Sequence, residues 1–355
     1  MLRGSHPSGN APASPFPGAL AAFVILVLSL LLPVTSAGAK PKDPASGTGI
    51  VWPPPPLPAR IALIQSISSP SDAGVKVSTL GRMANWLTGA GKGNERLVRP
   101  FGIACDEDNN LCITDTAEKS VAYLDRRQKK WFRFQKAGKL EFNSPVSVAK
   151  SGSTLFVADS AAGHVVAMSD QGKLLFLITN ELARPAALAL LKDKLLVVDS
   201  QQHRVCSYSL SGNFLGAYGG RGAEPGKFNF PTHIATDLSG NVYVTDSMNG
   251  RIQIFDASGT FKSQIGSLGD TPGHFGRPKG VAVDGLGHIY VIDGLFDNLQ
   301  IFNIQGQLLL TVGENGTGPG QFWLPNGIAI NKANEIYISD SYNRRLQVLK
   351  YIGPQ

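Results

Sequence analysis

The sequence predicts an all-β fold, and three observations lead to this prediction. First, the chain of 355 residues is 43% apolar, only 8% aromatic, and contains 40 Gly and 23 Pro. This composition is typical of short strands joined by many turns rather than of a helical bundle. Second, a pattern with a period of 40 to 47 residues recurs six times. Third, an isolated strand-like segment precedes the first repeat.

A proline and an aspartate mark each repeat and keep a constant register. The proline opens the repeat, and the aspartate closes an apolar run 14 or 15 residues later. Successive aspartates are 44, 40, 47, 47 and 47 residues apart, which predicts a repeat architecture. The prolines are Pro100, Pro145, Pro185, Pro231, Pro278 and Pro325, and the aspartates are Asp115, Asp159, Asp199, Asp246, Asp293 and Asp340.

The fourth repeat shows how many strands each unit contains. Residues 232–237 alternate small or apolar with polar side chains, residues 242–245 are β-branched or aromatic, and residues 251–255 alternate again. Turns separate these segments, and a fourth strand is expected at residues 261–265. Four short antiparallel strands per unit, repeated six times, form sheets arranged radially around an axis. The sequence therefore predicts a six-bladed β-propeller.

The last repeats resemble NHL repeats. The motifs that carry the resemblance are PKGVAVD at 278–284, PNGIA at 325–329 and ISDSYNR at 338–344. Three blade-connecting loops with the pattern Pro-Gly-x-Phe, at 225–228, 272–275 and 319–322, strengthen it. The resemblance covers residues 100–351, although repeats two and three lack the glycine that follows the proline motif. It implies a six-bladed propeller that mainly binds partners, with a minority of lyases and, in cytoplasmic members, RNA binders.

Residues 1–39 are predicted to be a signal peptide or membrane anchor. Arg3 precedes an uncharged apolar run at 19–34, and Ala37-Gly38-Ala39 fits a small-residue cleavage site. The run is slightly shorter than the roughly 17–25 residues that span a hydrocarbon core, which favours cleavage over a membrane tether. Either alternative predicts an exported domain, periplasmic or extracellular.

Residues 40–59 are predicted to be a Pro-rich linker, and the propeller is expected to span residues 60–355. Four consecutive prolines at 53–56 favour an extended, stiff spacer. The last repeat supplies a third strand near 345–351 but no fourth. The strand-like segment 61–67 is therefore expected to pair with it and to close the ring. A short helix is expected within residues 71–90.

The candidate ligand-binding residues lie where inner strands begin. In a propeller, the innermost strand starts near one mouth of the central channel, and the turn between the second and third strands returns to that mouth. Residues that follow each proline and each aspartate should therefore ring one face. The candidates chosen from this ring are Phe101, Thr232, His233, Lys279 and Asn326.

Neither a catalytic residue nor a metal site nor a cofactor is predicted. A catalytic zinc normally needs three converging protein ligands, and His233 is the only histidine at the start of an inner strand. The three-histidine ring of amidating lyases that share this fold is therefore missing. The six aspartates are interpreted as acceptors for the amides of their own turns. A carboxylate ring for metal binding or acid–base chemistry is the alternative.

A basic window lies between Arg126 and Lys139. It contains seven Lys or Arg residues and no acid, interleaved with three aromatic residues, in a chain whose net charge is +7. We interpret it as a solvated loop whose aromatics face the neighbouring sheet. Docking to an anionic membrane or acidic partner is the alternative, and nucleic acid is unlikely for an exported protein. The residues proposed for such docking are Arg126, Arg127, Lys129 and Lys130.

The three cysteines allow one disulfide at most. Cys105 and Cys112 flank the first hairpin turn and could lie directly opposite one another, and their pairing is left open. Cys206 is expected to be a buried thiol.

These observations predict an exported, non-catalytic scaffold that binds a protein or an extended ligand on one propeller face, without a cofactor. The alternative is a metal-dependent propeller lyase or hydrolase. Convergence of three metal-binding side chains at the channel mouth would favour that alternative.

Overall fold

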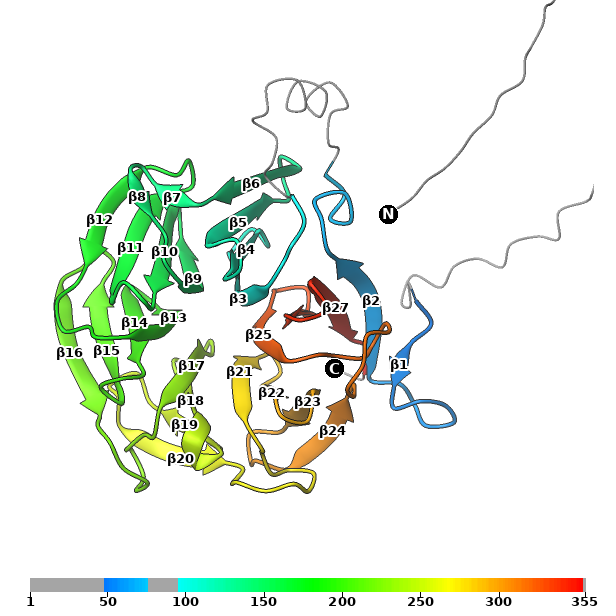
Figure 1. Ribbon diagram of the computed structural model, residues 1–355. Coiled ribbons are helices and arrows are strands. Elements are labelled where there is room, and N and C mark those ends of the chain that lie inside the picture. The colour runs from blue at the N-terminus through cyan, green and yellow to red at the C-terminus, as the bar shows by residue number, and fades with distance from the viewer. Residues whose placement is uncertain (1–47, 76–94, 354–355) are drawn as a thin grey trace, which may run out of the picture. The chain divides into compact units, whose positions relative to one another are not determined.

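A computed structural model describes residues 48–75 and 95–353 of the chain, and in these residues six sheets surround a common axis (Figure 1). In five of these sheets the strands follow one another outward from the axis in sequence order. The six inner strands pack beside one another around the ring, and β3 (Pro100–Cys105) contacts both β9 (Pro145–Ser151) and β25 (Pro325–Ile330). The predicted all-β, six-bladed propeller is thereby confirmed. No helix in the described ranges is long and apolar enough to cross a membrane.

Blades 1 to 3 have four strands each. Blade 1 consists of β3 (Pro100–Cys105), β4 (Leu111–Asp115), β5 (Ser120–Asp125) and β6 (Lys130–Phe134). A two-stranded hairpin, β7 (Lys136–Ala137) and β8 (Leu140–Glu141), leads to blade 2. Blade 2 consists of β9 (Pro145–Ser151), β10 (Thr154–Asp159), β11 (His164–Ser169) and β12 (Leu174–Ile178). Blade 3 consists of β13 (Pro185–Leu191), β14 (Lys194–Asp199), β15 (Arg204–Ser209) and β16 (Phe214–Gly219).

Blades 4 and 5 repeat this plan, and blade 6 differs. Blade 4 consists of β17 (Pro231–Thr236), β18 (Val242–Asp246), β19 (Arg251–Phe255) and β20 (Phe261–Ile265), with a short 3-10 turn at Ser247–Asn249. Blade 5 consists of β21 (Pro278–Val283), β22 (Ile289–Asp293), β23 (Asn298–Phe302) and β24 (Leu308–Val312). Blade 6 combines β25 (Pro325–Ile330), β26 (Glu335–Asp340) and β27 (Arg345–Tyr351) with β2 (Ile61–Ile67) and β1 (Val51–Trp52).

The N-terminal strand closes the last blade, as predicted. Strand β2 pairs antiparallel with β27, from Ile61 opposite Tyr351 to Ile67 opposite Leu346, and Figure 1 shows the blue strand beside the red one. Ile61 and Leu63 have no exposed surface and belong to the core between blades 5 and 6. Pairing therefore satisfies the edge of β27 and also buries apolar side chains.

The boundary between linker and propeller is a correction to the sequence prediction. Within the expected linker 40–59, Val51–Trp52 forms β1 and pairs with Ala62 and Ile61 of β2. Ile50 and Trp52 pack against the core between blades 5 and 6. The prolines at 53–56 thus connect two strands of a hairpin, because Trp52 gains apolar contacts that an extended spacer would forgo.

Two other expectations fall mainly outside the described residues. The leader 1–39 lies entirely outside them. Of the helix expected within 71–90, residues 71–75 form a turn region and the remainder lies outside the described ranges.

The six aspartates hold the start of each inner strand. Each is at most 1% exposed. Asp115 accepts hydrogen bonds from the backbone N–H groups of Val98 and Arg99, 2.8 and 3.0 Å away, and from Glu118 in its own turn. The sequence predicted the hydrogen bond from the aspartate's own turn. It did not predict the bonds from the two residues that precede the opening proline. The aspartate side chains therefore join the start of the first strand to the end of the second.

Candidate binding site at the channel mouth

Hydroxyl groups position the first residues of neighbouring inner strands. Thr245, which precedes the aspartate of blade 4, donates a hydrogen bond of 2.7 Å to the carbonyl of Lys279 on blade 5. Ser339 makes the equivalent 2.7 Å bond from blade 6 to the carbonyl of Phe101 on blade 1. Blades 4 and 6 thus each fix the backbone that carries a candidate residue of the next blade.

A small residue normally occupies the second position after each opening proline. A Cβ atom at Gly280 would lie 2.5 Å from the carbonyl oxygen of Asn326, and one at Gly327 would collide with the carbonyl of Phe101. Serine and alanine replace the glycine in blades 2 and 3. Blade 4 instead places His233 there, which brings an imidazole into the crowded centre of the ring.

The imidazole of His233 joins two candidate residues. Its Nε2 lies 3.0 Å from Oδ1 of Asn326 on blade 6, and its Nδ1 lies 3.1 Å from the hydroxyl of Thr232. Because an amide oxygen only accepts hydrogen bonds, Nε2 carries the proton and Nδ1 accepts from Thr232. The contact reaches from blade 4 to blade 6 past the inner end of blade 5.

Burial and a nearby cation keep this imidazole neutral. Burial in the ring, and then the ammonium of Lys279, lower the pKa of His233 to about 3, whereas the bond to Asn326 acts in the opposite direction. Burial, followed by the charge of Arg277, lowers the pKa of Lys279 to about 8. Two basic groups with lowered pKa values in one place are a common feature of functional sites.

Four of the five predicted site residues therefore form one polar cluster, consisting of Thr232, His233, Lys279 and Asn326. Phe101 lies on blade 1 beside the position of Gly327, and its side chain is partly exposed. It contributes an apolar surface rather than a polar contact of the cluster.

Sequence reasoning missed a second feature of the same mouth, which we call the apolar arc. It consists of large apolar side chains on the loops and turns of blades 4 to 6, each between 40% and 66% exposed. The members are Phe230, Met248, Leu268, Leu295, Trp323, Leu324 and Tyr342.

Backbone and ring contacts place two members of the arc beside one another, and a third member lies near the polar cluster. The N–H of Tyr342 donates to the carbonyl of Trp323, and their rings are 5.5 Å apart. Leu295 is next to Gly294, whose position contacts the side chain of Lys279. A comparison of equivalent turns could have found this feature, since blades 1 to 3 carry Ala, Ala and Gln where blades 4 to 6 carry Met, Leu and Tyr.

Arginines lie at the same mouth. Arg99, Arg184 and Arg277 each directly precede an opening proline, and all three are exposed. The guanidinium of Arg99 lies over the ring of Tyr342, 5.4 Å from its centroid. Since the repeat aspartates are buried and hydrogen-bonded, the accessible charge contributed by these repeat positions is positive.

The described residues contain no group of three or more His, Cys, Asp or Glu side chains that could hold a metal ion. The repeat aspartates satisfy backbone amides instead of facing one another around a common centre.

Cys105 and Cys112, which the sequence allows to lie directly opposite one another, are not paired in the structure. Cys105 pairs with Leu111 and Cys112 pairs with Ala104, because the turn closed between Asp106 and Asn110 shifts the register by one residue. Successive strand residues point to opposite faces, so the two thiols diverge. Both are free, as is Cys206, and burial raises the pKa of Cys105 to about 12 and of Cys206 to about 11.

Some basic side chains of the window between Arg126 and Lys139 form contacts within the propeller. Arg126 pairs with Glu335 at 3.5 Å and donates a hydrogen bond to the hydroxyl of Tyr337. Arg133 donates to the carbonyl of Arg96 at 2.9 Å. The aromatic residues Trp131, Phe132 and Phe134 pack against clusters shared with blades 6 and 2. The exposed cations of the proposed docking set are Arg127, Lys129 and Lys130.

Fold and site together define a six-bladed β-propeller with a polar cluster and an apolar arc at one mouth. Comparisons agree with this architecture: residues 236–293 and 281–351 match a family described as "6-bladed beta-propeller" (DUF5128). No curated protein matches the chain.

Solved structures with a similar fold have diverse roles. A streptogramin B lyase structure shares 12% identity over 72% of this chain and 94% of its own, with a TM-score of 0.55. A protein of unknown function from Bacteroides thetaiotaomicron shares 16% identity over 82% and 75%, with a TM-score of 0.57. Virginiamycin B lyase from Staphylococcus aureus shares 12% identity over 72% and 96%, with a TM-score of 0.53. At such identities, these similarities show the fold alone.

Proposed function

We propose that this protein is an exported, non-catalytic propeller of the NHL type that binds a polypeptide partner at the channel mouth. The observation that carries the proposal is the apolar arc: seven large apolar side chains exposed on one half of one face. Soluble monomers rarely expose large contiguous apolar patches, and such patches mark interaction sites. The partner would cover the arc.

The charges at this mouth define the chemistry of the partner. Arg99, Arg184 and Arg277 precede the inner strands of blades 1, 3 and 5 at this mouth, and Arg277 acts electrostatically on Lys279. A segment that carries aromatic or aliphatic side chains together with carboxylates would match both the arc and these cations. His233 is held neutral by its surroundings and contributes hydrogen bonds rather than charge.

The alternative function is a metal-dependent lyase or hydrolase. It would need a donor set that the described residues do not group together, and the polar cluster supplies only one imidazole. Metal analysis of the purified protein separates the two functions. Stoichiometric zinc or copper that is lost in His233→Ala would favour the enzyme.

Export is part of the proposal and rests on the predicted leader 1–39, with residues 19–34 as a tether if the leader is retained. Arg127, Lys129 and Lys130 then provide a surface for an anionic membrane. Nucleic acid remains an unlikely partner in that location.

The test is capture of partners from the envelope fraction of the source cell with the mature domain, followed by identification. We expect a specific partner that Leu295→Glu and Tyr342→Glu each weaken at least tenfold. Leu238→Glu is the matched control, because Leu238 is 96% exposed and lies in the turn between β17 and β18, at the opposite end of the strands. Equal capture by all variants, or equal loss with the control, would refute docking at the arc.

A further inference from the structure

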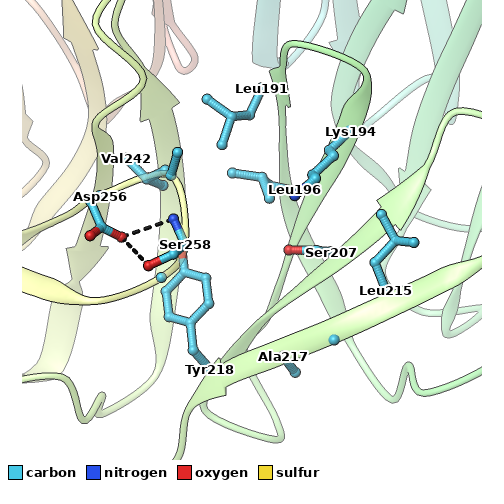
Figure 2. A pocket seen from close by; sticks show the side chains of 13 residues that line it. Leu191, Lys194, Leu196, Ser207, Leu215, Ala217, Tyr218, Val242, Asp256 and Ser258 are labelled. Carbon is cyan, nitrogen blue, oxygen red and sulfur yellow. Dashed lines mark hydrogen bonds between the residues drawn. The ribbon is translucent and has the colours of Figure 1, made fainter.

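A cleft with a volume of about 210 Å³ lies between blades 3 and 4 (Figure 2). Its walls come from the turn between β13 and β14, from the outer strands β15 and β16, and from the turn between β19 and β20 of blade 4. Both turns lie at the opposite end of the strands from the opening prolines. The cleft is therefore separate from the channel mouth and the apolar arc.

Two small residues create this cleft. Ser207 of β15 pairs with Gly216 of β16. The equivalent pairs in the other four-stranded blades each contain at least one large apolar side chain that packs toward the next blade; they are Tyr123 with Phe132, Ala167 with Phe176, Ile254 with Ser263, and Ile301 with Leu310. A Cβ atom at Gly216 would meet nothing within 4 Å. The blade interface is thus left unfilled here, in an interior that is otherwise closely packed.

The floor of the cleft is apolar. Leu191, Leu196 and Val242 are at most 6% exposed, and Figure 2 shows them among the side chains that line the cleft. The cleft volume is below the about 300–1,000 Å³ of sites for drug-sized ligands, which restricts an occupant to a small molecule.

Two polar groups of the cleft lack partners within the described residues. The hydroxyl oxygen of Tyr218 is buried and makes no hydrogen bond. Lys194 is partly buried in the wall and has no ion pair among the described residues. The nearby carboxylate of Asp256 instead accepts hydrogen bonds from the N–H and hydroxyl of Ser258, at 2.8 and 2.6 Å. A buried hydroxyl without a partner is uncommon in native proteins and calls for an acceptor.

We propose that this interblade cleft binds a small carboxylic acid with an apolar body. The ammonium of Lys194 pairs with the carboxylate, the leucine and valine side chains contact the body, and the hydroxyl of Tyr218 donates to an oxygen of the ligand. The proposal does not depend on the partner bound at the apolar arc.

Calorimetric and NMR titration of the purified full chain with phenylacetate tests the proposal. We expect saturable binding with a Kd below about 1 mM, with shifts confined to blades 3 and 4. The uncharged analogue phenylacetamide should bind at least about tenfold more weakly, because it forms no ion pair with Lys194.

Three variants discriminate the contacts. Lys194→Met should weaken phenylacetate about tenfold and leave phenylacetamide unchanged, whereas Lys173→Met, an exposed lysine on blade 2, should change neither. Ser207→Ile introduces the residue that blades 4 and 5 use at this position, and it should abolish binding of both probes while preserving the melting temperature. Absence of saturable binding, or equal affinities of the wild type and Lys194→Met for phenylacetate, would overturn the proposal.

Discussion

His233 on blade 4 donates a hydrogen bond from Nε2 to Oδ1 of Asn326 on blade 6, across 3.0 Å and 93 residues of sequence. The bond links two blades that are not neighbours in the ring. It also fixes the tautomer of an imidazole whose pKa is lowered to about 3. At neutral pH the inner strands of blades 4 and 6 are therefore joined by a hydrogen bond between two uncharged side chains.

The titration of His233 predicts a dependence of stability on pH. The folded pKa of about 3 lies below the ordinary value of 6.5, so the unfolded chain binds a proton first as the pH falls. Wild type should lose stability relative to His233→Gln between pH 6.5 and pH 4, by up to about 3 kcal/mol. Denaturant unfolding at several pH values measures the difference, and a gap between the two proteins that is constant with pH would contradict it.

Lys279 should titrate near pH 8. Burial and the charge of Arg277 lower its pKa to about 8, so a substantial fraction is unprotonated at pH 8. NMR titration of ¹³C-dimethylated lysines should show one resonance with this midpoint, and that resonance should be missing from Lys279→Arg. In Arg277→Gln the midpoint should rise, because a neighbouring positive charge is removed. A midpoint near 10.5 in the wild type would show that the lysine is fully solvated.

Three truncations test closure of the ring. A chain that begins at residue 48 should keep full stability. One that begins at residue 60 lacks β1 and the packing of Trp52, which should cost about 1–3 kcal/mol. One that begins at residue 68 exposes the edge of β27 and should aggregate. Thermal unfolding and light scattering measure these outcomes, and indistinguishable behaviour of the three chains would exclude a role of β2 in closure.

Close packing of inner strands predicts that alanine destabilises the protein at a glycine within such a strand but not at a glycine in an open turn. Gly327→Ala should destabilise by about 2–4 kcal/mol, because its Cβ would collide with the backbone of Phe101. Gly285→Ala should be nearly neutral, since a Cβ there meets nothing within 4 Å. Urea unfolding of both variants measures the effects. Similar free energies of unfolding would mean that the strands can separate at little cost.

The repeat made much of the architecture predictable. A proline and an aspartate at constant spacing define each blade, and the apolar pattern of residues 61–67 indicates a strand without a local partner. These patterns can be recognised within short segments of sequence. A chain of six similar units has few arrangements that bury the apolar side chains of every unit. The six blades and the closing role of β2 followed from the sequence for that reason.

Contacts between distant segments were decided only by the tertiary structure. The sequence placed Thr232, His233, Lys279 and Asn326 at the mouth, but the bond from His233 to Asn326 depends on how a circular arrangement brings blades 4 and 6 together. Trp52 belongs to the core because it packs against an apolar surface formed by blades 5 and 6. The prolines that follow it in the sequence favoured a linker instead. The cleft beside Gly216 likewise arises between two blades. The missing side chain of a glycine leaves a cavity only where no side chain of the facing blade fills the space.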